Sequence, residues 1–339
     1  MAVTARIADI AGHLPAQVLG NDALAALYPA WPADKILDKT GIRQRHIAAP
    51  HETAGDLACA AAQQLFAQGR VGAADVDFII LCTQTPDHLL PTTACLLQHR
   101  LGIGTHAGAL DINLGCSGFV YGLSLAKGLV EGGAARCVLL LTSDTYSKLI
   151  HPLDKSVRTL FGDGAAATAV VASDDPKPAI GPFVFGTDGS GAGHLIVPAG
   201  GARQPCSAAT AQTQRDASDN VRSAEQLCMD GAEVMAFTLR EVPRAVDAVL
   251  AKAGLAHDAI DYFVMHQANH FMLTALRKKL RVPPERLPIV MAETGNTVSA
   301  SIPLALLAMR AQGLLDAPRR LLLAGFGVGL SWAACVLNF

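Results

Sequence analysis

A candidate nucleophile, Cys116, stands in the segment NLGCSG (113–118), where an apolar strand is expected to give way to a helix after one tight turn. A cysteine at a helix N-terminus meets the positive end of the helix dipole and free backbone N–H groups, which lower the pKa of the thiol and make the sulfur nucleophilic. Most free cysteines, however, are small core residues. The turn leaves both interpretations open.

A candidate acid–base group, His266, opens the segment HQAN directly after an apolar strand. The carboxyl ends of strands are where α/β proteins place ligand-contacting groups. An imidazole N–H there can donate a hydrogen bond to a developing enolate oxygen. The alternative is a structural histidine with a satisfied hydrogen bond. His270 adds an HxxxH spacing, but the glutamate of HExxH is missing and no third ligand is evident, so we predict no zinc site.

A third candidate, Asn296, lies in ETGNTVSAS (293–301). Asparagine at a turn is ordinarily a turn former. Its position in the chain, described next, indicates that it faces the same cavity as Cys116. The glycine-rich turn at 325–329 can direct a backbone N–H toward a carbonyl bound at the sulfur, which together with the Cys116 N–H would form an oxyanion hole.

The elements that must position these residues occur twice. Residues 75–81 and 259–265 are apolar segments typical of buried strands, and the helices 92–100 and 271–280 follow them. Residues 108–144 and 287–327 each then read as strand, sharp turn, helix, strand. We therefore predict an α/β protein with two pseudo-symmetric halves, 1–175 and 176–339, whose turns meet at one central site.

Two further segments have distinct patterns. Residues 321–337 are mostly apolar, but a membrane-spanning helix needs about 20 residues, and alternate glycines at 325, 327 and 329 favour two strands joined by a tight turn. Residues 200–223 are polar without a clear period, so we expect a surface excursion that is either mobile or functional.

Composition limits the classes of partner. The chain of 339 residues is 51% hydrophobic and 17% charged, against roughly 25% charged in an average soluble domain. A large interface would bury the surplus apolar surface, so we predict a C2 homodimer. A net charge of −2 gives no field that would attract nucleic acid or an anionic membrane. Eight scattered cysteines without CxxC, and a start that lacks a signal peptide, predict a cytoplasmic protein.

Together with TGIR (40–43), HIAAP (46–50), FGDGA (161–165) and GAEV (231–234), the three candidate motifs resemble the β-ketoacyl-acyl-carrier-protein synthase III family over nearly the whole chain. The resemblance implies a thiolase-like fold with five αβαβα layers. The Cys-His-Asn trio also separates the chain from elongating synthases, which use two histidines, and from thiolases, which use a second cysteine.

The resemblance further implies a two-stage reaction that initiates fatty acid synthesis. Cys116 would attack an acyl-CoA thioester, with backbone N–H groups of Cys116 and of Gly327 or Val328 as the oxyanion hole. A malonyl thioester of acyl carrier protein would then lose carbon dioxide, and the enolate, held by His266 and Asn296, would attack the acyl group. Acyl-CoA is a substrate here, and no metal or other cofactor is expected.

Other roles are also implied only by the resemblance. Leu90 and Phe161 would shape the acyl pocket, and a leucine at position 90, where a partner-closing phenylalanine is common, would admit medium-chain primers. A basic group on the predicted helix would dock the acidic carrier, although such runs are usually solvated faces. The CoA or carrier entrance would comprise Lys35, Lys39, Arg43, Lys155 and Phe271, and the docking group Arg277, Lys278, Lys279 and Arg281.

Several entrance positions depart from the family pattern. Lys35 replaces a tryptophan that often stacks on the CoA adenine, Lys39 and Lys155 replace arginines, and Phe271 replaces another arginine. Lysine does not reproduce a stacked or bidentate arginine, so either CoA recognition is looser or the donor is not CoA. The alternatives are a specialised relative that uses a non-acetyl or carrier-bound primer for polyketides or other secondary products, and a silent partner subunit, against which the intact trio argues.

Overall fold

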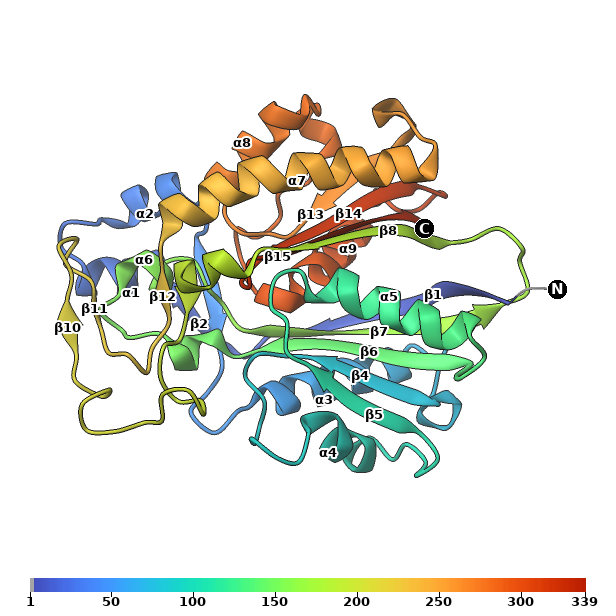
Figure 1. Ribbon diagram of the computed structural model, residues 1–339, viewed down its shortest axis with the longest axis horizontal. Coiled ribbons are helices and arrows are strands. Elements are labelled where there is room, and N and C mark those ends of the chain that lie inside the picture. Colours follow the sequence, from blue (N-terminus) through green and yellow to red (C-terminus); the bar gives the residue numbers. More distant parts are fainter. Residues whose placement is uncertain (1–2) are drawn as a thin grey trace.

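Two β-sheets form the centre of the protein, and the computed structural model describes residues 3–339 (Figure 1). The first sheet has the strand order β1-β7-β6-β4-β5 and the second has the order β13-β14-β15-β8. The strands of the first sheet are β1 (Thr4–His13), β4 (Phe78–Cys82), β5 (Gly108–Ile112), β6 (Cys137–Asp144) and β7 (Gly164–Ser173). Those of the second are β8 (Ile180–Thr187), β13 (Tyr262–Met265), β14 (Arg320–Gly327) and β15 (Ser331–Asn338).

Helices complete five layers (Figure 1). Between the sheets lie α5 (Gly118–Glu131) and α9 (Ser301–Ala311). The outer face of the first sheet is covered by α3 (Ala54–Ala67) and α4 (Thr93–Arg100), and that of the second by α7 (Gly231–Ala253) and α8 (His270–Leu280). The predicted α/β fold with αβαβα layers is therefore confirmed.

Smaller elements gather at one end of both sheets, on the left in Figure 1. They are β2 (Gln17–Gly20), α1 (Asn21–Leu27), α2 (Ala33–Thr40), β3 (Gln44–Ile47), α6 (Lys155–Arg158), β9 (Leu195–Ile196), β10 (Gln214–Arg215), β11 (Val221–Arg222) and β12 (Cys228–Met229). Single 3-10 turns lie at 73–75, 146–149, 189–194, 257–259, 284–286 and 298–300. The excursion 200–223 is anchored here, because Arg222 forms ion pairs of 2.7 Å with both Asp154 and Asp216.

Small residues on α5 explain how this helix fits between two sheets. A Cβ atom on Gly118 would lie 2.1 Å from Cys82 Sγ, and one on Gly122 would lie 2.6 Å from a Leu140 methyl group. Around it, Val, Ile and Leu side chains of β4, β6 and β14 are almost fully buried, each contributing roughly 1.5–3 kcal/mol through loss of apolar surface from water. The helix that follows Cys116 is therefore held in a tightly packed interior.

The predicted strand-turn-strand at 321–337 is confirmed as β14 and β15, which pair antiparallel from Arg320–Asn338 to Gly327–Ser331. No helix within residues 3–339 is long and apolar enough to cross a membrane. The strands predicted at 75–81 and 259–265 are confirmed as β4 and β13, although each begins about one turn later because a 3-10 turn precedes it. The helices predicted at 92–100 and 271–280 are confirmed as α4 and α8.

One predicted strand is wrong. The segment before Asn296, residues 287–292, joins neither sheet. Pro288 has no N–H to give to a ladder, while the Val290 N–H donates to Gln267 Oε1 at 2.9 Å and the Ala292 carbonyl accepts from the Arg43 N–H at 2.8 Å. The second sheet thus has four strands. All strands of the first sheet precede residue 175 and all of the second follow residue 176, while the division into two domains there stays a prediction.

Candidate active site

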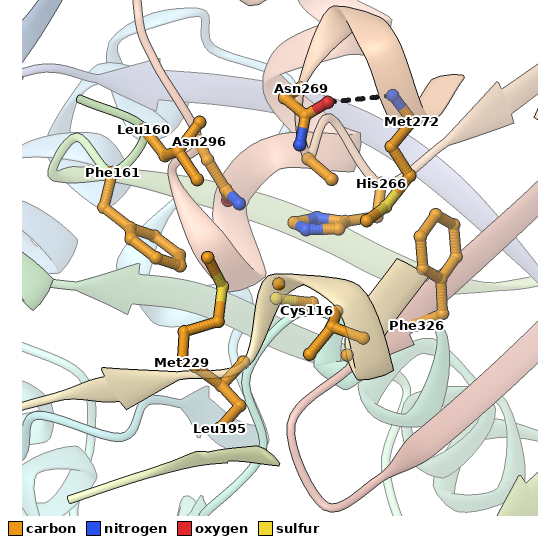
Figure 2. A pocket seen from close by; sticks show the side chains of 14 residues that line it. Cys116, Leu160, Phe161, Leu195, Met229, His266, Asn269, Met272, Asn296 and Phe326 are labelled. Carbon is orange, nitrogen blue, oxygen red and sulfur yellow. Dashed lines mark hydrogen bonds between the residues drawn. The ribbon is translucent and has the colours of Figure 1, made fainter. Parts of the chain in front are cut away.

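The structure brings Cys116, His266 and Asn296 together at one cavity of about 70 Å³. Figure 2 shows the thiol, the imidazole and the amide pointing into this cavity from three separate segments. Phe161, predicted to shape the acyl pocket, is buried in the same wall, together with Leu195 and other residues that the sequence did not single out.

Cys116 lies between β5 and α5, and backbone rather than side chains surrounds its sulfur on one side. A Cβ atom on Gly327 would lie 2.9 Å from Cys116 Sγ, and one on Gly325 would lie 2.7 Å from the Cys116 carbonyl oxygen. Glycine at these two positions therefore lets the end of β14 approach the nucleophile. This close approach is the structural reason for the alternate glycines seen in the sequence.

The expectation of a lowered thiol pKa is wrong. Burial, with a further contribution from the Asp144 carboxylate, raises the pKa of Cys116 to about 12, although the backbone N–H groups of Cys116 and Val328 act to lower it. Desolvation thus outweighs the helix N-terminus. The thiol is neutral at pH 7, and the same two N–H groups face the sulfur.

His266 follows β13, and its ring is held by two contacts. Nδ1 lies 2.7 Å from Ser301 Oγ, and the edge of the Phe326 ring meets the imidazole with centroids 5.6 Å apart. Burial lowers the pKa of His266 to about 3, so the ring is neutral. We assign the Ser301 hydroxyl as the donor to Nδ1, so the neutral ring carries its proton on Nε2. The imidazole then offers an N–H to the cavity.

Asn296 is oriented in a similar way. Its Oδ1 accepts a hydrogen bond of 3.0 Å from the Val298 N–H, which leaves the amide NH₂ for the cavity. Its backbone N–H donates to the Leu160 carbonyl at 2.9 Å, and its carbonyl accepts from the Gly162 N–H at 3.0 Å. The turn carrying this amide is therefore fixed against the segment 160–162, which belongs to the other half of the chain.

Two supporting residues were missed by the sequence. Gln267 is buried, and its amide bonds the Met265 carbonyl at 2.9 Å as well as the Val290 N–H at 2.9 Å. Asp144, at the end of β6, accepts from the Gln84 N–H at 2.8 Å and from the N–H and hydroxyl of Ser299. Burial raises the pKa of Asp144 to about 7. The sequence around Asp144 gave no sign of its role, and the only sign for Gln267 was its position inside HQAN.

Three of the five predicted entrance residues lie on α2 and α8, which contact each other. Lys35 and Lys39 are exposed on α2, and Phe271 is 66% exposed at the start of α8. Gly41, which ends α2, packs directly against His270. Lys35 donates to the Ala30 carbonyl at 3.0 Å, Arg43 pairs with Glu293 at 2.6 Å, and Lys155 donates to the Ser218 carbonyl. Trp31, not noted in the sequence, lies 5.2 Å from the Lys35 ammonium.

The other predicted residues lie further out. Leu90 is 84% exposed before α4 and does not line the cavity of Cys116. Lys278, Lys279 and Arg281 are exposed at the C-terminal end of α8, whereas Arg277 is half-buried and donates to the Val282 carbonyl at 3.4 Å. Within residues 3–339 no group of three or more His, Cys, Asp or Glu side chains is arranged to hold a metal ion.

Comparison with known proteins supplies an independent line of evidence. Two family models match, 3-oxoacyl-[acyl-carrier-protein (ACP)] synthase III at residues 110–189 and its C-terminal part at residues 250–339. The β-ketoacyl-[acyl-carrier-protein] synthase III of Caldanaerobacter subterraneus subsp. tengcongensis is 35% identical over 99% of this chain and 98% of its own.

Solved structures agree with the family models. A crystal structure of a 3-oxoacyl-(acyl-carrier-protein) synthase III is 68% identical, with a TM-score of 0.98 over 99% of this chain and 100% of that one. The 3-oxoacyl-(acyl-carrier protein) synthase of Burkholderia xenovorans LB400 is 40% identical, with a TM-score of 0.91 over 99% and 95%. A priming β-ketosynthase of the R1128 polyketide pathway is more distant, at 30% identity and a TM-score of 0.84 over 99% and 96%.

Proposed function

Because the chain belongs to the β-ketoacyl-[acyl-carrier-protein] synthase III family, we propose that Cys116 carries the acyl primer and that His266 and Asn296 hold the malonyl-derived enolate. The enzyme is an acyltransferase that condenses an acyl thioester with malonyl-acyl-carrier protein and initiates fatty acid synthesis. The assignment of each step to particular side chains rests on the geometry of the cavity.

In the first step Cys116 takes the acyl group. The sulfur forms a bond to the thioester carbonyl carbon, the bond from that carbon to the CoA sulfur breaks, and the thiol proton leaves with the CoA thiol. Negative charge develops on the carbonyl oxygen. The N–H groups of Cys116 and Val328, which already face the sulfur, stabilise it, and each such donor contributes about 3 kcal/mol in comparable sites.

In the second step the malonyl unit loses carbon dioxide, and the electron pair of the broken C–C bond forms an enolate. Its oxygen accepts hydrogen bonds from His266 Nε2–H and from the Asn296 amide. The carbanion then attacks the acyl carbonyl, Cys116 leaves as a thiolate, and the β-ketoacyl product remains on the carrier. Decarboxylation supplies the carbanion, so the proposed chemistry requires no metal or redox cofactor. Burial of the cavity excludes water and strengthens both hydrogen bonds.

One observation carries the assignment: the sulfur and two hydrogen-bond donors, each oriented by its own neighbour, line a single cavity. Intact-mass analysis after incubation with a panel of acyl-CoAs tests it. We expect the native protein to gain one acyl mass and Cys116→Ala to gain none. His266→Ala should become acylated and fail to condense. Acylation of Cys116→Ala, or full condensation by His266→Ala, would contradict the assignment.

The quaternary state and the carrier site are also part of the proposal. Strand β5 is an unpaired edge of the first sheet, and Leu89 and Leu90, which precede α4, are 92% and 84% exposed. These features support a homodimer, for which sedimentation should give twice the chain mass of 35.3 kDa. The basic end of α8 is proposed to receive the acidic carrier. A cytoplasmic location stays a prediction.

A further inference from the structure

A second cavity, of about 320 Å³, adjoins the catalytic one. Leu195 lines both, and the turn between β14 and β15 contributes Val328 and Gly329 to the wall of the second. An acyl group on Cys116 whose oxygen is bound by the Val328 N–H has its carbonyl carbon beside this wall. The rest of the acyl chain can extend from there into the second cavity.

The second cavity is not lined like a pocket for a plain hydrocarbon. Leu149 and Leu227 line it, but three polar side chains share the wall with them. These are Gln84, Asn113 and Tyr146, and they come from three separate loops of the first half.

Hydrogen bonds join the three polar side chains into one group. The Tyr146 hydroxyl donates to Gln84 Oε1 at 2.5 Å, and Gln84 Nε2 donates to Asn113 Oδ1 at 3.1 Å. The group lies against the residue that precedes the nucleophile, since a Cβ atom on Gly115 would lie 2.5 Å from Gln84 Oε1. Tyr146 is buried and Gln84 half-buried. Asn113 is exposed, so the polar group runs from the surface at Asn113 to the buried Tyr146 in the wall of the second cavity.

The group has hydrogen-bonding capacity left over. Each primary amide has two N–H donors. Within the described chain, Gln84 uses one of them on Asn113, and Asn113 uses neither on another protein group. The Tyr146 oxygen also keeps its acceptor lone pairs. The cavity thus offers N–H donors to an oxygen on a ligand, and a plain alkyl chain would remove water from these groups without replacing its hydrogen bonds.

We propose that the second cavity receives the primer's acyl chain, and that Gln84, Asn113 and Tyr146 select a primer carrying an oxo or hydroxyl oxygen over a plain alkyl primer of equal length. This inference rests on the proposed function, because it requires the acyl chain to be attached at Cys116. A single unmatched polar group changes selectivity by about fivefold to 150-fold, which corresponds to about 1–3 kcal/mol.

The experiment measures the rate of Cys116 acylation by intact mass with octanoyl-CoA and with octanoyl-CoAs that bear a hydroxyl or oxo group at C3, C5 or C7. We expect kcat/KM for at least one oxygenated primer to exceed that for octanoyl-CoA about tenfold. Gln84→Met, which keeps the side-chain length and removes the amide, should cancel this preference by lowering kcat/KM for the oxygenated primer relative to that for octanoyl-CoA. Tyr146→Phe should act in the same direction, and Gln63→Leu, on the exposed face of α3, serves as the matched control.

The outcomes separate this inference from the proposed function. If the native protein takes octanoyl-CoA as well as or better than every oxygenated primer, or if Gln84→Met slows all primers equally, the polar selection is wrong while acylation of Cys116 stands. If no acyl group reaches Cys116 from any donor, the proposed function itself fails. Thermal unfolding of each variant identifies a loss that comes from misfolding, and in that case Gln84→Met and Tyr146→Phe are compared at a temperature where both are folded.

Discussion

The two halves of the molecule hold their matching turns by different means. In the first half, β5 pairs in parallel with β4 from Gly108 to Ile112, and the chain passes from this regular strand almost directly to Cys116. In the second half the segment before Asn296 joins no sheet, and its polar backbone groups bond to the Gln267 side chain and to the backbone of residues 43 and 44. The nucleophile is therefore placed by a sheet, and the amide by side-chain and inter-half contacts.

The difference shows how a site between two halves can keep a fixed geometry. The Asn296 turn bonds to residues 160 and 162 of the first half through its own backbone N–H and carbonyl. Ser299 bonds to Asp144 across the same boundary. The Asn296 amide is therefore held in place by contacts with the half that carries Cys116, and not by a strand of the second sheet. We expect lesions in the two halves to affect the two reaction steps unequally.

The largest effect should come from the catalytic turn of the second half. Asn296→Ala removes one enolate donor, so condensation should fall by about 10²–10³-fold, while the rate of Cys116 acylation stays near native. Single-turnover acylation and steady-state condensation measure the two steps separately. An equal loss in both rates would mean that this turn also positions the nucleophile, and the comparison between the halves would break.

The second largest effect should come from the Gln267 side chain, which bonds the segment 287–292 in place of a neighbouring strand. Gln267→Leu leaves the Val290 N–H and the Met265 carbonyl without their partner, and an unsatisfied buried group costs about 1–3 kcal/mol. Urea unfolding should show this loss, and condensation should suffer more than acylation. Gln63→Leu in the first half, where the side chain is exposed on α3, should change neither. A native-like Gln267→Leu would show that the segment needs no such support.

Opposite pH slopes should distinguish the buried titrating group of each half. His266 has a folded pKa of about 3, below its unfolded value of about 6.5, so its contribution is complete above pH 6.5 and is lost as the pH falls toward 3. Asp144 has a folded pKa of about 7, above its unfolded value of about 3.9, so its contribution is complete below pH 4 and is lost as the pH rises through 7.

Each group changes the free energy of unfolding by at most about 1.4 kcal/mol per pH unit within its window. Between pH 4 and 6.5 the two slopes oppose each other, so His266→Gln should leave a stability that falls as the pH rises, and Asp144→Asn one that increases with pH. Denaturant unfolding at several pH values between 4 and 8 measures both slopes. Identical curves for the native protein and either variant would show that the replaced group keeps its unfolded pKa in the fold.

The smallest effect should come from the surface, where helix α8 differs from its counterpart α4. Lys278→Glu with Lys279→Glu should raise KM for malonyl-acyl-carrier protein about threefold to tenfold at low salt and leave acylation intact. Arg277 is a poorer choice because it supports the Val282 carbonyl. The matched control is Arg136→Glu with Lys177→Glu. Both positions are exposed, Arg136 just before β6 and Lys177 between β7 and β8. An equal rise in KM for both pairs would indicate net charge rather than a docking site.

Most of the architecture could be predicted from the sequence because the strands are continuous apolar runs and the duplicated spacing is regular. It also located Cys116 and His266, since each follows an apolar strand, and Asn296 through the duplicated spacing. The extra strand before Asn296 was predicted wrongly because Ile289 and Val290 are typical strand residues. The Val290 N–H bonds to the Gln267 side chain instead of to a neighbouring strand. This is a tertiary contact that no local sequence pattern reveals.

The thiol pKa and the polar wall were also beyond sequence reasoning. The helix N-terminus at Cys116 is a local feature and was predicted, but desolvation depends on what closes over the sulfur, which comes from β14 more than 200 residues later. Gln84, Asn113 and Tyr146 meet only because three strands of one sheet end at the same edge. Each is an ordinary loop residue when considered alone.

The turn between β14 and β15 has a consequence for anyone wishing to redesign this enzyme. Because its backbone both faces the sulfur and walls the second cavity, altering the turn to change primer size would also disturb the rate of thioester exchange. The side chains of Gln84, Asn113 and Tyr146 also line the second cavity, but they supply no N–H group to the sulfur. Libraries aimed at new starter groups should therefore vary positions 84 and 146 and leave 327–330 untouched.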